Sequence, residues 1–158
     1  MIHVERIDEM YNSTTKLYHI TNASDIKKFE IRYKKGMGTS FYGAGVYFTK
    51  DLNVIDYYKQ LMWDSFDELY MYTVVLKPTA RIYNEDDEEK GGALYLRLCD
   101  ENYGDELEAT KEIVKKYKVD GIEYYGEEDG DSVVIYNPNV IKIVDKVKLE
   151  KDSDENEW

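Results

Sequence analysis

The sequence contains 158 residues, enough for one domain with a sizeable core but not for two full-sized domains. Its 33 acidic side chains outnumber 21 basic ones, and the resulting net charge of -12 argues against a general nucleic-acid binder, which needs clustered Lys and Arg. The single cysteine, Cys99, excludes an internal disulfide, and no cluster of Cys and His predicts a metal site.

The ends of the chain differ in character from its middle. Residues 1–15 lack periodicity and are predicted to form an N-terminal arm, residues 16–149 form a single domain, and the acidic residues 150–158 form a frayed tail. No run approaches the ~20 apolar residues of a membrane helix, and the first ten residues carry charges where a signal peptide would be apolar. We therefore expect a cytoplasmic protein without a membrane partner.

The first predicted elements are a strand and a short helix. Leu17 to Ile20 is an apolar run typical of a strand, and either Asn22 or Ser24 can cap a helix that continues to Phe29. The only basic cluster of the chain overlaps and follows this helix. It comprises Lys27, Lys28, Arg32, Lys34 and Lys35. Such a cluster is either a solvated face or a surface that faces a phosphate.

A glycine-rich stretch precedes the next strand. Four glycines occur within ten residues, the last two being Gly43 and Gly45, and the apolar run 46–48 follows them as a strand. Thr49 or Asp51 then caps a helix predicted from Leu52 to about Trp63, because apolar residues recur on one of its faces.

The second half of the chain is dominated by strands. Strands are predicted over 69–76, 80–83, 121–125, 132–136 and 140–144, and helices over 91–98 and 106–117. Because the strands do not alternate regularly with helices, the pattern favours a mixed α+β domain over a parallel doubly wound sheet.

Common nucleotide-binding and hydrolase motifs are absent from the sequence. The stretch GMGTSFYG lacks the Lys-Ser or Lys-Thr of a phosphate loop, and it is followed by a strand where a dinucleotide fingerprint requires a helix. No Gly-x-Ser-x-Gly elbow occurs, which argues against a serine hydrolase.

Three separated motifs nevertheless form a coherent set. They are Tyr18-His19-Ile20-Thr21 at a strand end, Gly43-Ala44-Gly45-Val46-Tyr47-Phe48-Thr49 with the pair Tyr57-Tyr58 on the helix after it, and Asp131-Ser132-Val133-Val134-Ile135-Tyr136-Asn137-Pro138 near the end. Their order and spacing resemble the ADP-ribosyltransferase family, in its diphtheria-toxin-like branch and the small versions encoded by phages and mobile elements. The resemblance covers roughly residues 16 to 145 and implies a mixed, mainly antiparallel, split β-sheet with a few flanking helices.

The resemblance assigns a role to most of these residues. His19 would bond the adenosine ribose of NAD, the backbone of Ile20 would hold the nicotinamide amide, and Thr21 completes that motif. Tyr47 would form one wall of the nicotinamide slot. Gly45 and Phe48, which flank Tyr47 in the same motif, would also contact NAD. Tyr58 would stack on the opposite face, with Tyr57 as the alternative. Arg32 and the rest of the basic cluster would lie near the NAD phosphates or near the target. No metal is implied.

The catalytic acid of the third motif is where the sequence departs from the family. Ser132 stands where the family has a glutamate, and Asp131, one residue earlier, would point to the opposite face of a regular strand unless Gly130 introduces a bend. Three alternatives stay open: Asp131 serves as the acid, Asp129 or Glu127 reaches in from the acidic loop, or the site has no catalytic acid.

These alternatives lead to different functions. Cleavage of the bond between nicotinamide and ribose passes through an oxocarbenium-like state, so a transferase needs a rigid slot for the ring and a carboxylate near the ribose. The resemblance implies transfer of ADP-ribose from NAD to a macromolecule, a protein being favoured over nucleic acid, in the role of a toxin or anti-defence effector. The alternatives are an acidic protein that inhibits a basic partner surface, and a sensor that binds NAD or ADP-ribose without turnover. The sequence does not indicate an oligomeric state.

Overall fold

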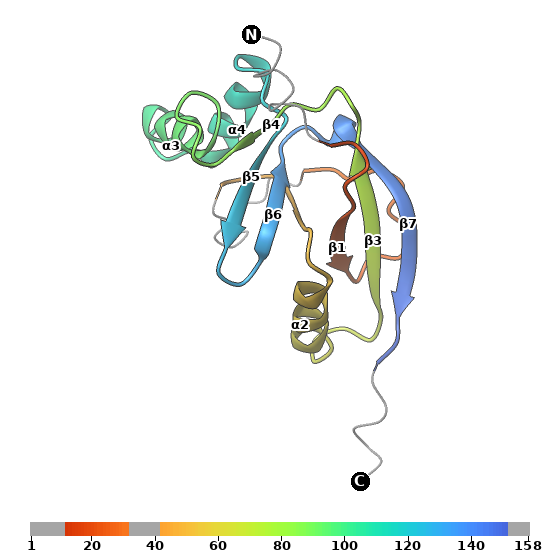
Figure 1. Cartoon of the computed structure of the whole chain (residues 1–158). Coiled ribbons are helices and arrows are strands. Elements are labelled where there is room, and N and C mark those ends of the chain that lie inside the picture. The colour runs from red at the N-terminus through yellow and green to blue at the C-terminus, as the bar shows by residue number, and fades with distance from the viewer. Residues whose placement is uncertain (1–11, 32–41, 152–158) are drawn as a thin grey trace.

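The chain forms a mixed sheet flanked by helices. The computed structural model describes residues 12–31 and 42–151, and in these segments seven strands form one sheet in the order β4-β5-β6-β2-β1-β3-β7 (Figure 1). The strands are β1 (Leu17–Thr21), β2 (Val46–Thr49), β3 (Leu69–Leu76), β4 (Ile82–Asn84), β5 (Gly121–Gly126), β6 (Gly130–Ile135) and β7 (Ile141–Leu149). The helices are α2 (Leu52–Met62), α3 (Gly92–Glu101) and α4 (Glu106–Lys115), and a 3-10 turn, η1, covers Pro138–Val140. The predicted α+β class is confirmed.

The sheet is antiparallel at every junction except one. β4 runs parallel to β5, and α3 and α4 form the crossover that such a pair requires. Among the described residues, no helix has the length and apolar character needed to cross a membrane.

The sheet is weakest between β1 and β2. These strands share the single register pair Tyr18↔Thr49, whereas β1 pairs with β3 from Leu17 to Thr21 and β2 pairs with β6 along its whole length. Figure 1 shows β5 and β6 on one side of this junction, β1, β3 and β7 on the other, and α2 near their ends. A gap in the backbone pairing therefore lies beside α2, where side chains from both parts can meet.

Two hydrophobic clusters stabilise the two faces of this sheet. Alternate residues of a strand point to opposite faces, so the neighbours Val133 and Val134 of β6 belong to different clusters. Val133 packs with Phe48 and Tyr72, while Val134 packs in the cluster that α3 and α4 cover. β6 thus contributes side chains to both parts of the core.

Acidic side chains begin two of the helices. Asp51 precedes α2, and its carboxylate accepts a hydrogen bond from the Asn53 N–H at 2.8 Å, as one of the two predicted caps. Asp105 does the same for α4, accepting from the N–H groups of Leu107 and Glu108 at 3.1 Å. These bonds satisfy N–H groups that have no partner within the helix.

The predicted helix from residue 22 or 24 to Phe29 does not form. The reason is the buried Tyr72 of β3, whose hydroxyl donates to the Ala23 carbonyl at 2.8 Å and accepts from the Ile26 N–H at 3.1 Å. Thr21 Oγ1 also accepts from the Ala23 N–H, at 3.2 Å. Backbone groups that a helix would pair internally are paired with side chains instead, and Phe29 is buried against β3.

Candidate functional site

A pocket of about 270 Å³ opens beside the junction of β1 and β2. Its walls come from β1, β2, α2 and the hairpin between β5 and β6. The lining residues are Tyr18, His19, Ile20, Tyr47, Phe48, Thr49, Val54, Ile55, Tyr58, Met62, Tyr124, Asp129 and Ser132. The structure therefore brings the three motifs, which are far apart in the sequence, around one cavity.

His19 is held in one orientation at the edge of β1. Its Nδ1 lies 2.8 Å from the Tyr47 carbonyl oxygen, and its ring packs against Phe29 and Phe48 with centroids 5.3 and 5.6 Å away. A carbonyl only accepts, so Nδ1 carries the proton and Nε2 keeps a lone pair. Burial lowers the pKa of His19 below 6.5, and the bond to Tyr47 only partly offsets this effect. At neutral pH the ring is therefore an uncharged hydrogen-bond acceptor at Nε2.

Tyr47 is fixed by the glycine turn that precedes it. Its hydroxyl donates to the Gly43 carbonyl at 2.7 Å and accepts from the Tyr42 N–H at 3.2 Å. Gly43 has φ 83°, and Gly45 lies so close to β6 that a Cβ there would be 2.6 Å from a methyl group of Val134. The glycines thus allow the turn to pack on β6 and to present the Tyr47 ring to the pocket.

Asp129 supplies the carboxylate of the pocket. The Tyr58 hydroxyl donates to Asp129 Oδ1 in a short hydrogen bond, and the Tyr124 hydroxyl donates to Oδ2 at 3.4 Å. Burial raises the pKa of both phenols well above 10, and the bond and charge of Asp129 raise them further. Both phenols therefore remain protonated donors that hold the carboxylate in place between α2 and β5.

The backbone of Asp129 is held by two side-chain hydrogen bonds. Thr49 Oγ1 and Ser132 Oγ both donate to the Asp129 carbonyl oxygen, each at 2.9 Å, and both side chains are buried. Gly130, with φ 63°, closes the short hairpin by pairing with Gly126. Ser132, predicted at the catalytic position, thus lines the pocket and fixes the loop that carries the acid.

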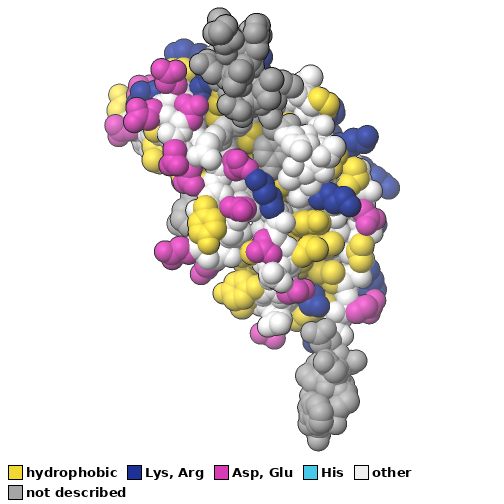
Figure 2. Space-filling view, viewed as in Figure 1, with side chains coloured by type: hydrophobic (Ala, Val, Ile, Leu, Met, Phe, Trp, Pro, Cys, Tyr) yellow, Lys and Arg dark blue, Asp and Glu magenta, His cyan; other side chains and the backbone are white. Residues whose placement is uncertain are grey.

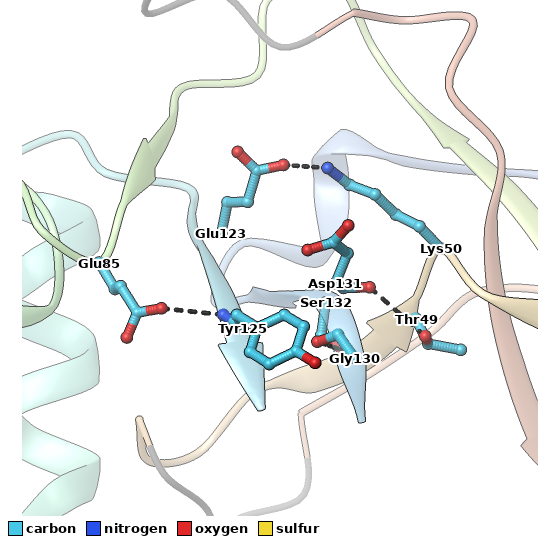
Figure 3. A network of polar contacts seen from close by, with 8 residues as sticks. All are labelled: Thr49, Lys50, Glu85, Glu123, Tyr125, Gly130, Asp131 and Ser132. Carbon is cyan, nitrogen blue, oxygen red and sulfur yellow. Dashed lines mark hydrogen bonds and ion pairs between the residues drawn. The ribbon is translucent and has the colours of Figure 1, made fainter. Parts of the chain in front are cut away.

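Asp131 is not among the residues that line the pocket. It is exposed and pairs in register with Tyr125, whereas buried Ser132 pairs with Tyr124. Figure 3 shows the Asp131 carboxylate on the same side as the ion pair between Lys50 and Glu123. The alternation of β6 continues through residue 131 without a bulge, so Gly130 does not turn Asp131 toward the pocket. Of the three acids that the sequence offers, Asp129 lines the pocket, and Asp131 and Glu127 do not.

The remaining predicted residues divide into three groups. Ile20, Phe48 and Tyr58 line the pocket. Thr21 bonds the Ala23 N–H and Tyr57 is an exposed residue beside Tyr58, so neither lines it. Arg32 lies outside the described residues, as do Lys34 and Lys35 of the basic cluster.

Tyr124 is a polar residue of the pocket that the sequence motifs did not predict. Its signal is present, because the segment Gly126-Glu127-Glu128-Asp129-Gly130 is a short acidic turn between two strands. Pairing Gly126 with Gly130 across that turn places Tyr124 opposite Ser132. Among the described residues, no three His, Cys, Asp or Glu side chains are grouped so that they could hold a metal ion.

The chain is similar in fold to a solved structure of a toxin-antitoxin system. It matches a chain of the crystal structure of the M. tuberculosis MbcT-MbcA toxin-antitoxin complex with a TM-score of 0.51 and 15% identity, over 92% of this chain and 91% of that chain. A crystal structure of an anti-CRISPR protein also matches, with a TM-score of 0.36 and 10% identity over 87% and 98% of the two chains, and a likeness of that size does not establish a shared fold. No protein-family model and no curated protein matches the sequence.

Proposed function

We propose that this protein is an ADP-ribosyltransferase that uses NAD as its substrate and Asp129 as its acid. The observation that carries the proposal is the convergence of His19, Tyr47 and Tyr58 on one pocket that also contains a carboxylate held by two phenols. Sites that enclose a whole ligand usually measure ~300–1,000 Å³. The volume of about 270 Å³ therefore fits the nicotinamide-ribose end of NAD better than the whole molecule.

Each side chain has a task in this reaction. The Tyr47 ring forms a rigid wall for the nicotinamide, and the Tyr58 ring forms another wall from α2. His19 Nε2 accepts a hydrogen bond from a ribose hydroxyl, which the lowered pKa of the ring permits at neutral pH. The apolar side chains of Val54, Ile55 and Met62 exclude water from the slot.

Bond cleavage then proceeds with a balanced transfer of charge. The bond between the ribose C1′ and the nicotinamide nitrogen breaks, and its electron pair moves to the pyridinium nitrogen, so nicotinamide leaves as a neutral molecule. Positive charge develops on the ribose, and the Asp129 carboxylate stabilises it electrostatically. The nucleophile of the target then bonds to C1′ and transfers its proton to water.

The comparison supports a protein partner and a toxin-like role. The fold is similar to that of a chain from a toxin-antitoxin complex, in which a toxin is bound to its antitoxin partner. We propose by analogy that this chain modifies a protein and that a second protein controls it.

The test uses two aspartates of the same hairpin. NAD is incubated with the protein and a cell lysate, nicotinamide release is followed by chromatography, and modified proteins are identified by mass spectrometry. Asp129→Asn lowers nicotinamide release by about 10²–10³-fold, because it removes the charge that faces the ribose. Asp131→Asn removes the same charge from the face away from the pocket and changes the rate by less than about twofold.

The other outcomes assign different functions. Equal rates for Asp129→Asn and the wild type would refute the role of Asp129. Nicotinamide release without any modified protein would make the chain an NAD hydrolase. Calorimetric binding of NAD without release would make it a sensor, and the absence of both binding and release would leave the pocket without a role in NAD chemistry.

A further inference from the structure

We propose that a second pocket, at the opposite end of the β5–β6 hairpin from Asp129, binds a small diphosphate-bearing ligand such as a nucleoside diphosphate. This pocket measures about 700 Å³ and is lined by Arg81, Lys90, Val114, Lys115, Tyr117, Lys118, Asp120 and Asn137. Asp120 and Asn137 flank the open end of the hairpin, and six residues of strand separate them from the turn. At about 3.3 Å per residue the two pockets lie about 20 Å apart, so the second is a separate site.

Four cations converge on this pocket from three parts of the chain. Arg81 comes from the segment before β4, Lys90 from the loop before α3, and Lys115 and Lys118 from the end of α4. Lysines at the end of a helix are favoured by the helix dipole alone, but this does not explain Arg81 and Lys90. The concentration of four cations is unusual in a chain whose net charge is -12.

These cations are available to a ligand. Within the described segments none of the four forms an ion pair, whereas Lys111 and Lys116 of the same helical region pair with Glu108 and Glu112. Lys90 lies over the Tyr83 ring, with its Nζ 5.1 Å from the centroid. That contact orients the ammonium group but does not neutralise its charge.

Asp120 is the one acid among the residues that line this pocket, and the four cations outnumber its single negative charge. Asp120 Oδ2 accepts from the Arg81 backbone N–H at 2.9 Å, and Oδ1 accepts from Asn137 Nδ2 at 2.9 Å. Both oxygens are therefore engaged by donors, and the Arg81 side chain stays free of Asp120. These bonds fix the Asp120 side chain and the Arg81 backbone in place beside the cations.

The size of the pocket and the screening of the surrounding acidic charge by salt indicate the class of ligand. Its volume of about 700 Å³ is large enough for a small molecule, and the pocket is widely open to solvent. The acidic remainder of the surface repels a long polyanion. At physiological salt this repulsion is screened beyond ~8 Å, so a short anionic ligand interacts mainly with the four cations of the pocket. Val114 and the Tyr117 ring add an apolar wall suited to a base or sugar. A nucleoside diphosphate combines these features.

The test is calorimetric titration of the full chain with ADP, pyrophosphate and adenosine. ADP and pyrophosphate bind and adenosine does not, and rising salt weakens the binding of both anions. The double variant Arg81→Ala/Lys115→Ala raises the Kd of ADP by about tenfold or more, because hydrogen bonds between cations and phosphates are among the strong ones. The Arg81 backbone bond to Asp120 is kept in this variant, and unfolding curves check its folding.

Matched variants separate this site from the first pocket. Lys111→Ala removes a cation of the same helix outside the pocket and leaves the Kd of ADP within about twofold. Each of four results would overturn the proposal: no ADP binding, equal binding of adenosine, loss of ADP binding in His19→Ala but not in the double variant, or tighter binding of a single-stranded oligonucleotide than of ADP. The last would assign the cations to nucleic acid.

Discussion

The hydroxyl of Tyr72 is predicted to hold residues 22–29 in their non-helical conformation. Tyr72 is 1% exposed, and its hydroxyl is the partner of two backbone groups, the Ala23 carbonyl and the Ile26 N–H. Tyr72→Phe keeps the ring and removes both hydrogen bonds. It therefore tests the bonds without creating a large cavity.

The expected loss of stability follows from these two bonds. A net hydrogen bond contributes about 1 kcal/mol, and a buried group left without a partner costs about 1–3 kcal/mol. Ala23 and Ile26 are only half-buried, so water replaces part of what is lost. We expect the free energy of unfolding to fall by about 2 kcal/mol, which lowers the Tm of a chain of this size by about 4–8 °C.

Denaturant and thermal unfolding measure this loss, and Tyr70→Phe is the matched control. Tyr70 lies on the same strand, but its hydroxyl donates to the exposed carboxylate of Glu68 at 3.1 Å, so its removal changes stability by less than about 0.5 kcal/mol. If Tyr72→Phe were no more destabilising than Tyr70→Phe, the two backbone bonds would not be what replaces the predicted helix.

Three further predictions concern the site. Gly43→Ala destabilises the chain by about 1–3 kcal/mol more than Gly104→Ala in denaturant unfolding. Both glycines have φ near 80°, but only at Gly43 would a Cβ lie 1.8 Å from the Tyr95 hydroxyl. Equal losses of stability would contradict the close packing of the turn. The pKa of His19 is lower in the folded than in the unfolded state, so its contribution to stability is present above pH ~6.5 and is lost as the pH falls and the unfolded chain binds the proton. Unfolding curves of the wild type therefore lose stability more steeply between pH 7 and 5.5 than those of His19→Gln, and parallel slopes would show that the ring is not buried as described. Tyr58→Phe keeps the ring but removes the hydrogen bond to Asp129, so nicotinamide release falls by about tenfold while the NAD affinity measured by calorimetry is unchanged. Tyr57→Phe, on the exposed side of α2, is the control and releases nicotinamide at the wild-type rate.

The overall distribution of charge on the surface does not reveal the basic character of the second pocket. Figure 2 shows acidic side chains spread around α3, α4 and the β5–β6 hairpin, and hydrophobic side chains over the part of the sheet that β1 and β3 form. The cations of the second pocket, such as Arg81 and Lys118, become a group only when their elements are assembled. A prediction from net charge alone would therefore exclude phosphate ligands from this protein altogether.

The sequence by itself determined the elements whose signals are local. The strand 69–76, the helix that begins after Asp51 and the helix before residue 117 follow from alternation, apolar periodicity and capping side chains, all of which act over a few residues. The resemblance of the three motifs to those of a known family led to the prediction that His19, Tyr47 and Tyr58 would meet. The structure places all three at the same pocket.

Tertiary structure decided the points that depend on partners distant in the chain. Asn22 and Ser24 are good caps, but Tyr72, some fifty residues away, takes the backbone groups that a helix would need. Which aspartate lines the pocket, Asp129 or Asp131, likewise depends on where the β5–β6 hairpin turns and on which carboxylate the two phenols can reach. Capping and alternation are short-range preferences, and a buried hydroxyl or a fixed strand register overrides them once the core has formed.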